Sequence, residues 1–201
     1  MASHTYRRSY RGTRRRPIYF CGFLVILLLA VGFFLFRQTR DKTRWNTYQN
    51  DELGVALEWP ETFAATDLTE QEQAANIVFR ITREEPSALF SLRFESGLGP
   101  LKLAGGTVFD ALVEAINRRY PDRFPDYKKE KYEEFVLATE KAALFEFTYL
   151  GTDGETRMKQ RFVLVVKDNA AYYLSCQASE EDFLEATDAF GRIVSSFEFL
   201  D

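Results

Sequence analysis

Hydrophobic and polar positions alternate along most of the chain after residue 44, and this alternation predicts a β-rich domain. In the run 76–83, Ile77, Phe79 and Ile81 fall on one side, and the run 88–95 repeats the pattern. A two-residue period is that of a strand with one buried face. Turn-forming residues separate these two runs at 84–87, and Gly151–Gly154 predicts a hairpin turn. Further strands are expected at 45–49, 54–59, 131–138, 142–150, 156–167, 172–177 and 196–200.

Two segments change to a helical period. The first is predicted from about Val108 to Arg119, with Thr107 and Asp110 as a capping pair and Pro121 as its stop. The second begins at Ser179, where Asp182 completes a capping pair. The apolar positions that share one helix face are Phe109, Leu112, Val113, Ile116 and Tyr120 in the first, and Phe183, Ala186, Phe190 and Ile193 in the second. Residues 61–75 are polar and Ala-rich, which suggests one helical turn.

The order of these elements, ββ-ββ-α-ββββ-α-β, defines the expected fold. Short turns between consecutive strands require a largely antiparallel sheet. The run Phe162–Val166 is apolar on both faces, which predicts a central strand covered on both sides. We therefore expect an α/β (α+β) fold: an α/β/α three-layer sandwich around a largely antiparallel sheet, preceded by one transmembrane helix.

The membrane helix is predicted at 18–36, nineteen residues without a charge. At 1.5 Å per residue it would span about 28 Å, close to the hydrocarbon core of a bilayer. The expected organisation is a basic cytoplasmic tail at 1–17, the transmembrane helix, a linker at 37–44 and one domain at 45–201. A cleaved signal peptide is the alternative, with Ala30–Gly32 as a small-x-small site, but the apolar run continues past it.

Charge on the two sides of the apolar run predicts its orientation. Six arginines and no acid precede it, whereas a net charge of three follows it in 37–44. The positive-inside rule therefore places the N-terminus in the cytoplasm and the domain outside. The expected location is the cytoplasmic membrane, with a single pass and with the lipid bilayer contacting residues 18–36.

The domain itself is acidic. Residues 45–201 hold sixteen basic and twenty-nine acidic side chains, a net charge of −13. Binding to nucleic acid needs clustered positive charge, so nucleic acid is not an expected partner.

Three features resemble the PsbP-like domains, which share a fold with the Ran-binding Mog proteins of nuclear import. They are Tyr48 followed by GVALEWP at 54–60, the four strands around Gly151–Gly154, and an ending with YYL at 172–174 and IVSSF at 193–197. The resemblance covers about 48–199 and rests on core and turn residues, so it implies a fold and not an activity. The family is associated with protein interaction rather than catalysis. Because this chain keeps its anchor and lacks a recognisable counterpart of the plant members' functional N-terminal segment, the resemblance does not imply a photosynthetic role.

Candidate chemistry is sparse. The only histidine is His4, so the domain has no Ser-His or Cys-His pair, and Cys176 lies on a predicted strand as a core residue. The glycine-rich loop at 97–107 lacks Walker spacing, because Lys102 precedes the glycine pair. Adjacent acids at 84–85, 133–134 and 180–182 are typical of solvated or helix-capping groups. We expect no catalytic residue, no metal site and no cofactor.

One stretch stands out against the acidic background, the segment 118–132 with sequence RRYPDRFPDYKKEKY. With Pro121 and Pro125 in it, the segment is expected to form a surface loop. Arginine and aromatic residues are favoured in interfaces. The candidate surface for a protein partner or a lipid headgroup comprises Arg118, Arg119, Arg123, Lys128, Lys129, Lys131, Tyr120, Phe124 and Tyr127. The alternative is a solvated segment whose aromatic side chains fold inward.

Together these observations predict a membrane-tethered, non-enzymatic interaction or assembly domain of a bacterium, with a membrane or extracytoplasmic protein as its partner. Two alternatives remain open at this point: a carboxylate-dependent hydrolase or transferase, and a domain that senses a small ligand.

Overall fold

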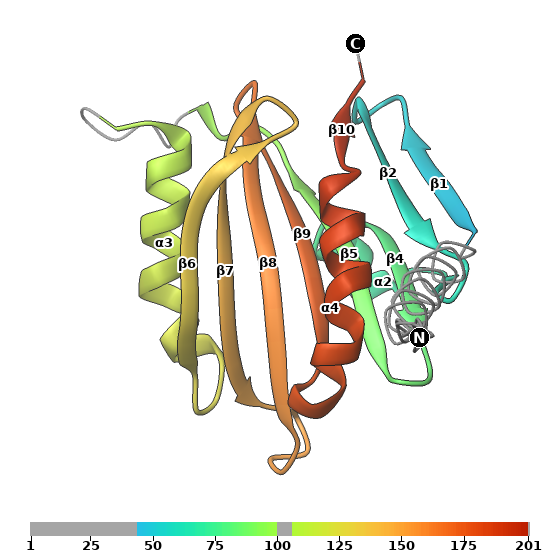
Figure 1. Cartoon of the computed structure of the whole chain (residues 1–201). Helices are drawn as coiled ribbons and strands as arrows, with labels where there is room; N and C mark the ends of the chain where they lie inside the picture. The colour runs from blue at the N-terminus through green and yellow to red at the C-terminus, as the bar shows by residue number, and fades with distance from the viewer. Residues whose placement is uncertain (1–43, 100–105, 201) are drawn as a thin grey trace, which may run out of the picture. The chain divides into compact units, whose positions relative to one another are not determined.

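A computed structural model describes residues 44–99 and 106–200. The elements of this part of the chain are shown in Figure 1. In order they are β1 (Trp45–Asn50), β2 (Val55–Pro60), β3 (Ala64–Ala65), α2 (Glu70–Ala74), β4 (Ile77–Arg83), β5 (Ala88–Glu95), α3 (Val108–Arg123), β6 (Lys128–Leu137), β7 (Glu140–Leu150), β8 (Arg157–Lys167), β9 (Ala170–Ser179), α4 (Glu180–Ser195) and β10 (Glu198–Phe199).

The large sheet has the order β3-β4-β5-β9-β8-β7-β6, and its neighbouring strands are antiparallel. Short hairpins join β4 to β5 and each strand from β6 to β9 to the next, as the turn residues predict. A mixed α+β fold dominated by antiparallel sheet is therefore confirmed.

The large sheet carries a hydrophobic core on each of its two faces, and β8 contributes to both. Val163 and Val165 belong to one hydrophobic core with α4, whereas Phe162 and Leu164 belong to a second core with α3. Successive side chains of a strand point to opposite faces, so α3 and α4 cover opposite sides. The prediction that Phe162–Val166 forms an interior strand is confirmed.

A second sheet, β1-β2-β10, packs on the side of α4. Its core residues are Val55 and Leu57 of β2, and Phe197 before β10 packs with them. The final strand pairs with β2 across most of the sequence of the domain, Glu198 opposite Ala56 and Phe199 opposite Val55. The layer opposite α3 therefore contains a small sheet as well as a helix.

The predicted end of the first helix is wrong. α3 runs to Arg123 and contains Pro121 in its last turn. Proline removes one backbone donor, but the N–H of Phe124 still donates to the carbonyl of Tyr120 at 3.1 Å. Tyr120 also packs against Phe162 of the sheet, with ring centroids 5.4 Å apart. This tertiary contact holds the last turn in helical geometry beyond the point where proline was expected to stop it.

Several strands also extend beyond their predicted ends, because ladder pairing continues past the alternating residues, whereas β10 is shorter than the predicted 196–200. β6 begins at Lys128 rather than 131, and β9 covers Ala170–Ser179 rather than 172–177. Among the described residues, no helix is long and apolar enough to cross a membrane. The predicted transmembrane helix at 18–36 lies outside the described residues, as do the tail and most of the linker.

Candidate functional site

The predicted candidate surface divides into two parts in the structure. Arg118, Arg119 and Arg123 are exposed on the last turns of α3, whereas Lys128, Lys129 and Lys131 lie on β6. The expectation of one surface loop at 118–132 is therefore wrong, because α3 continues through Pro121 and β6 starts at Lys128.

The aromatic residues of the stretch pack inward. Tyr120, Phe124 and Tyr127 are partly buried against the core beneath α3. Their ring centroids lie 5.4 Å from Phe162, 4.7 Å from Tyr149 and 5.1 Å from Phe147, respectively. These three residues fix the end of α3 on the sheet and so position the arginines, but they do not form an exposed aromatic surface.

The lysines of β6 lie among acidic and polar neighbours. Lys131 is 2.5 Å from Glu133 and Lys129 donates to the side chain of Asn117 at 2.9 Å. β6 is the last strand of the large sheet, and charged side chains on such an edge oppose pairing with other chains. We therefore separate these lysines from the arginines as a solvated edge.

The arginines of α3 border a groove that continues over the sheet. Its larger part measures about 490 Å³ and its smaller part about 330 Å³. Both parts are lined by Arg93, Tyr120, Arg123 and Tyr173, so they adjoin. We call this feature the arginine groove, because Arg93, Arg118, Arg119 and Arg123 line its larger part, where Glu95 is the single carboxylate.

The floor of the arginine groove consists of cross-strand pairs of β5 and β9. Leu89 lies opposite Gln177, Ser91 opposite Ser175, and Arg93 opposite Tyr173. Residues at every second position share a sheet face, which is why these side chains form one surface. α3 supplies the wall with Leu112, Ile116 and the arginines.

Arg93 and Tyr173 form the centre of the floor. The guanidinium carbon of Arg93 lies 3.9 Å from the Tyr173 ring centroid, and Arg93 Nη2 lies 3.3 Å from Glu95 Oε2. The Tyr173 hydroxyl donates to the same carboxylate at 3.2 Å. Burial is the main cause that raises the pKa of Tyr173 to about 12, so this hydroxyl remains a donor at neutral pH. The Nε of Arg93 is buried without a hydrogen-bond partner among the residues that the structure describes.

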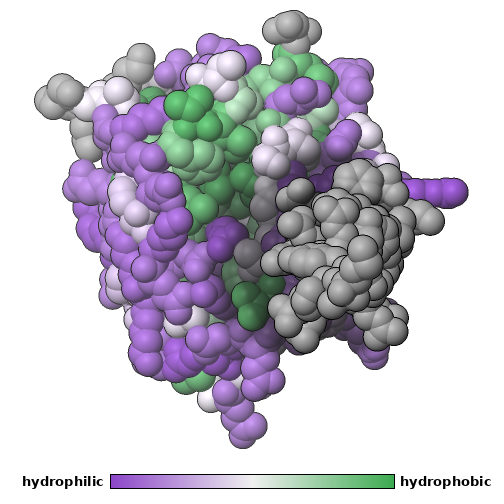
Figure 2. Space-filling model, viewed as in Figure 1, coloured by the Kyte–Doolittle hydropathy of each residue, from purple (hydrophilic) through white to green (hydrophobic). Residues whose placement is uncertain are grey.

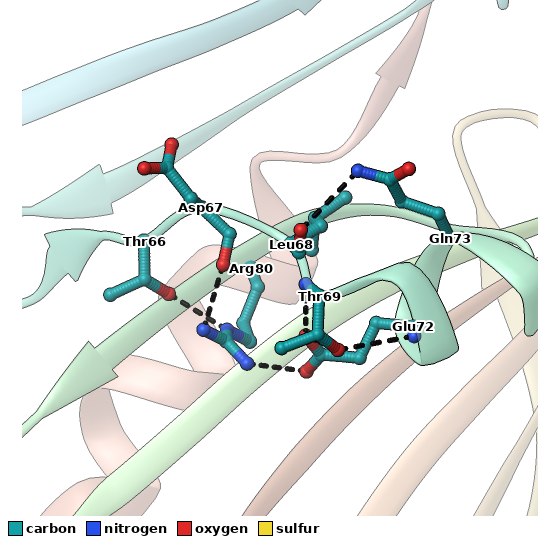
Figure 3. Close-up of polar contacts among 7 residues, drawn as sticks. All are labelled: Thr66, Asp67, Leu68, Thr69, Glu72, Gln73 and Arg80. Atoms are coloured by element: carbon teal, nitrogen blue, oxygen red, sulfur yellow. Dashed lines mark hydrogen bonds and ion pairs between the residues drawn. The ribbon is translucent and has the colours of Figure 1, made fainter.

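At the smaller end, Glu72 of α2 and Ala75, which follows this helix, form a side of the groove. Arg80 anchors this short helix, as Figure 3 shows. Its guanidinium donates to Thr66 Oγ1 at 2.7 Å, to the carbonyl of Asp67 at 2.9 Å and to the carboxylate of Glu72. Hydrogen bonds from Thr69 are the largest cause of the lowered pKa of Glu72, and Arg80 adds to it. Arg80 therefore has a structural role.

A second charged cluster lies on the opposite face of the large sheet. Glu146 contacts Lys159 at 2.9 Å and Arg161 at 2.6 Å, and Lys159 also contacts Glu130 at 2.6 Å. Both cations lie over the ring of Phe183 on α4, at 5.3 and 5.5 Å. Two carboxylates compensate two cations here, so the cluster is a structural network that connects β6, β7, β8 and α4.

An apolar groove of about 500 Å³ lies between α4 and the C-terminal end of β6. Figure 2 shows it as part of a hydrophobic area in the upper half of the view, over β6 and toward α4. Its lining includes Phe135, Val136, Leu144 and Val194. Arg161 is the single charged residue in this lining, so the groove offers shape but few directional contacts.

The remaining candidates from the sequence have structural roles or stay untested. Cys176 is buried, which raises the pKa of its thiol, and the prediction that it is a core residue is confirmed. The hydroxyl of Ser196 caps the end of α4. Thr107 and Asp110 form the predicted capping box of α3. Residues 100–105 of the glycine-rich loop lie outside the described residues.

Sequence reasoning missed Arg93 and Tyr173. Arg93 alternates with Phe90, Leu92 and Phe94 on β5, so the pattern assigns it to the face away from the core. That face is a groove floor because α3 covers only the neighbouring strands. The one available signal was the polar series Ser91, Arg93 and Glu95 on a strand of this acidic domain.

No protein-family model matches the chain, and no curated protein matches it. Solved structures do resemble it. CyanoP, the cyanobacterial PsbP of Synechocystis, superimposes with a TM-score of 0.56 and 12% identity over 78% of this chain and 93% of its own. LpqN, involved in cell envelope biogenesis of Mycobacterium tuberculosis, gives 0.54 and 11% over 81% and 94%. The protein Mog1 gives 0.50 and 7% over 79% and 97%.

These similarities show that the described domain has a PsbP/Mog-like fold, as the sequence resemblance implies. At such low identity they speak to the fold alone.

Proposed function

We propose that this chain is a membrane-tethered, non-enzymatic interaction domain outside the cytoplasmic membrane of a bacterium, and that it binds its partner through the arginine groove. The tether is the apolar segment 18–36, and the arginine-rich tail before it favours an N-terminus in the cytoplasm. The neighbours in fold include an envelope protein and a PsbP protein, which is compatible with a non-enzymatic role.

The observation that carries the proposal is the concentration of positive charge in one concave site of an acidic domain. Four arginines and one carboxylate line the larger part of the arginine groove, whereas residues 45–201 have a net charge of −13. The positive charge of these arginines, in a domain that is otherwise acidic, has no evident role in solubility. Arginine and tyrosine are also the side chains that most often dominate binding energy in interfaces.

The arginines of the wall are available for a ligand. The side chains of Arg118 and Arg119 make no hydrogen bond or ion pair within the part of the chain that the structure describes, and the guanidinium carbon of Arg123 lies 5.7 Å from the centre of the Phe124 ring. Arginine donates up to five hydrogen bonds and pairs with carboxylates in a bidentate manner. The groove therefore presents unused donors beside an apolar wall, which suits recognition better than bond cleavage.

A photo-crosslinking experiment in native membranes tests this function. A benzophenone amino acid replaces Ser91 in the full-length protein, and a second protein carries it at Glu155, which is exposed in the β7–β8 turn. We expect a crosslinked product from position 91 that disappears when Arg119 and Arg123 are changed to Ser. Equal products from both positions, or a product that persists without the arginines, would contradict the proposal.

A further inference from the structure

The floor of the arginine groove has a regular spacing. Leu89, Ser91, Arg93 and Glu95 follow one another at every second position of β5, and each pairs across to β9. Leu89 and Glu95 are six positions apart in the strand, which corresponds to roughly 20 Å at about 3.3 Å per residue. The groove is therefore a trough that runs along the strands beside α3.

The interval between successive floor pairs equals the interval between side chains on one side of an extended polypeptide. In a strand-like segment, side chains that point to one side recur every two residues, or about 6.6 Å. A segment of about seven residues laid along the trough would therefore place one side chain over each of the four successive floor pairs. A compact small molecule would fill only a fraction of such a trough.

The chemistry of the floor changes along its length. One end has the cationic pair of Arg93 with Tyr173, beside Arg119 and Arg123 of α3. The other end has hydroxyl and amide groups, where Gln160 donates to Ser175 Oγ at 2.6 Å and Gln177 lies nearby in the same lining. Amides and hydroxyls can both donate to and accept from a peptide backbone. The floor thus offers partners for acidic side chains and for main-chain groups.

We infer that the arginine groove binds an extended, acidic segment of a partner protein, in which carboxylates alternate with apolar side chains. This inference rests on the proposed function and specifies its ligand. The carboxylates pair with Arg93, Arg119 and Arg123, and the apolar side chains contact Ala111 and Ala115, which are partly exposed on the wall. Glu95 lies at the end of the floor beyond Arg93 and repels a carboxylate placed next to it. This repulsion helps to fix which residue of the segment lies over each floor pair.

The test uses the full-length protein in nanodiscs of phosphatidylcholine, which carries no net charge. The probe is a fluorescein-labelled peptide of about eight residues in which glutamate alternates with leucine, and fluorescence anisotropy measures its binding. We expect saturable binding that weakens about ten- to a hundredfold in the double variant Arg119→Ser/Arg123→Ser. The control variant Lys128→Ser/Lys131→Ser removes the same charge from the edge strand β6, and its affinity should stay within about twofold.

A charge reversal guards against a variant that is merely misfolded. Arg119→Glu/Arg123→Glu should lose the glutamate peptide and gain binding of a peptide in which lysine alternates with leucine. A reversed variant with the circular dichroism spectrum of the parent that gains nothing would overturn the inference.

Competition experiments distinguish an acidic peptide from other negatively charged ligands. Inorganic phosphate, or vesicles that contain phosphatidylglycerol, should displace the peptide poorly at equal total charge. Full displacement by either would mean that charge alone is recognised and would overturn the inference. If the peptide does not bind but the crosslink from position 91 still depends on the arginines, the ligand class is wrong and the proposed function stands. Absence of both results would overturn both.

Discussion

Arg93 and Tyr173 face each other across the ladder between β5 and β9, and the guanidinium lies 3.9 Å from the centre of the phenol ring. The ring fixes the plane of the guanidinium, and Glu95 accepts from both side chains. A cation held in one orientation loses less rotamer freedom when it binds a carboxylate than a mobile one does. This pair therefore prepares the centre of the arginine groove for a ligand.

The first prediction concerns this pair. Arg93→Lys keeps the charge but loses the planar stack, so we expect the free energy of unfolding to fall by about 0.5–1 kcal/mol. Thermal unfolding of the full-length protein should show a Tm lower by about 1–4 °C. Arg118→Lys, on the exposed wall of the same groove, is the matched control and should leave Tm unchanged. Equal effects of the two changes would show that the stack contributes nothing to stability.

The second prediction concerns the pH dependence contributed by Glu146. Burial opposes its charged form, but hydrogen bonds from Lys159 and Arg161 outweigh burial and lower its pKa below the ordinary 4.5. Because the folded pKa lies below the unfolded value, the carboxylate stabilises the fold above about pH 4.5, and this stabilisation is lost as pH falls through the folded pKa. Glu146→Gln should cost about 1–3 kcal/mol at neutral pH.

Urea unfolding at a series of pH values checks this expectation. The difference in the free energy of unfolding between the parent and Glu146→Gln should shrink steadily below about pH 4.5. The same substitution at the exposed Glu114 should give a curve close to that of the parent. A difference for position 146 that is constant with pH would refute the role of this ion-pair network.

The third prediction concerns the proline within α3. Pro121→Ala restores a backbone N–H that can donate to the carbonyl of Asn117, so stability should rise by about 1 kcal/mol and Tm by about 2–4 °C. Pro125→Ala, beyond the end of the helix, restores no helical hydrogen bond and should bring no gain. A loss of stability at position 121 would mean that restriction of the unfolded chain by proline outweighs the missing bond.

The fourth prediction concerns topology. Leu184 is 81% exposed on α4, whereas Cys176 is buried. In a protein with Cys21→Ser and Leu184→Cys, a membrane-impermeant maleimide should label intact cells at position 184. Cys176 should react only after denaturation and so reports whether the protein is folded. Labelling of position 184 only after cell lysis would place the domain in the cytoplasm and contradict the proposed orientation.

Local patterns predicted most of the elements because their signals lie within a few residues of each other. The alternation in β5, the turn at Gly151–Gly154 and the inner face of α4 all survive in the structure. In β4 the prediction holds for Phe79 and Ile81 but is wrong for Ile77, because a register shift between Ile77 and Phe79 places Ile77 opposite Arg93, in the lining of the groove. The exceptions arise from distant contacts. Tyr120 holds α3 in helical geometry past Pro121 through its packing on Phe162, and β10 joins a separate sheet through β2.

The candidate site was predictable only in part. Arg118, Arg119 and Arg123 were found because their charge contrasts with the acidic domain. Arg93 and Tyr173 were not, because a sequence pattern assigns a strand residue to one of two faces but does not say how far a helix covers that face. The groove depends on where α3 lies on the sheet, which many side chains determine together.

The pairing of β1 has a mechanical consequence. The described chain enters the domain at Arg44, and the adjoining strand β1 is hydrogen-bonded to β2 alone. Tension applied through the N-terminal side would therefore act first on the six residue pairs of this ladder. The arginine groove lies on the other face of the large sheet, so β1 would separate from β2 under load while β2 stays in the core and the groove keeps its shape. Release of β1 would lengthen the connection ahead of the domain and limit the force that reaches a partner bound in the groove.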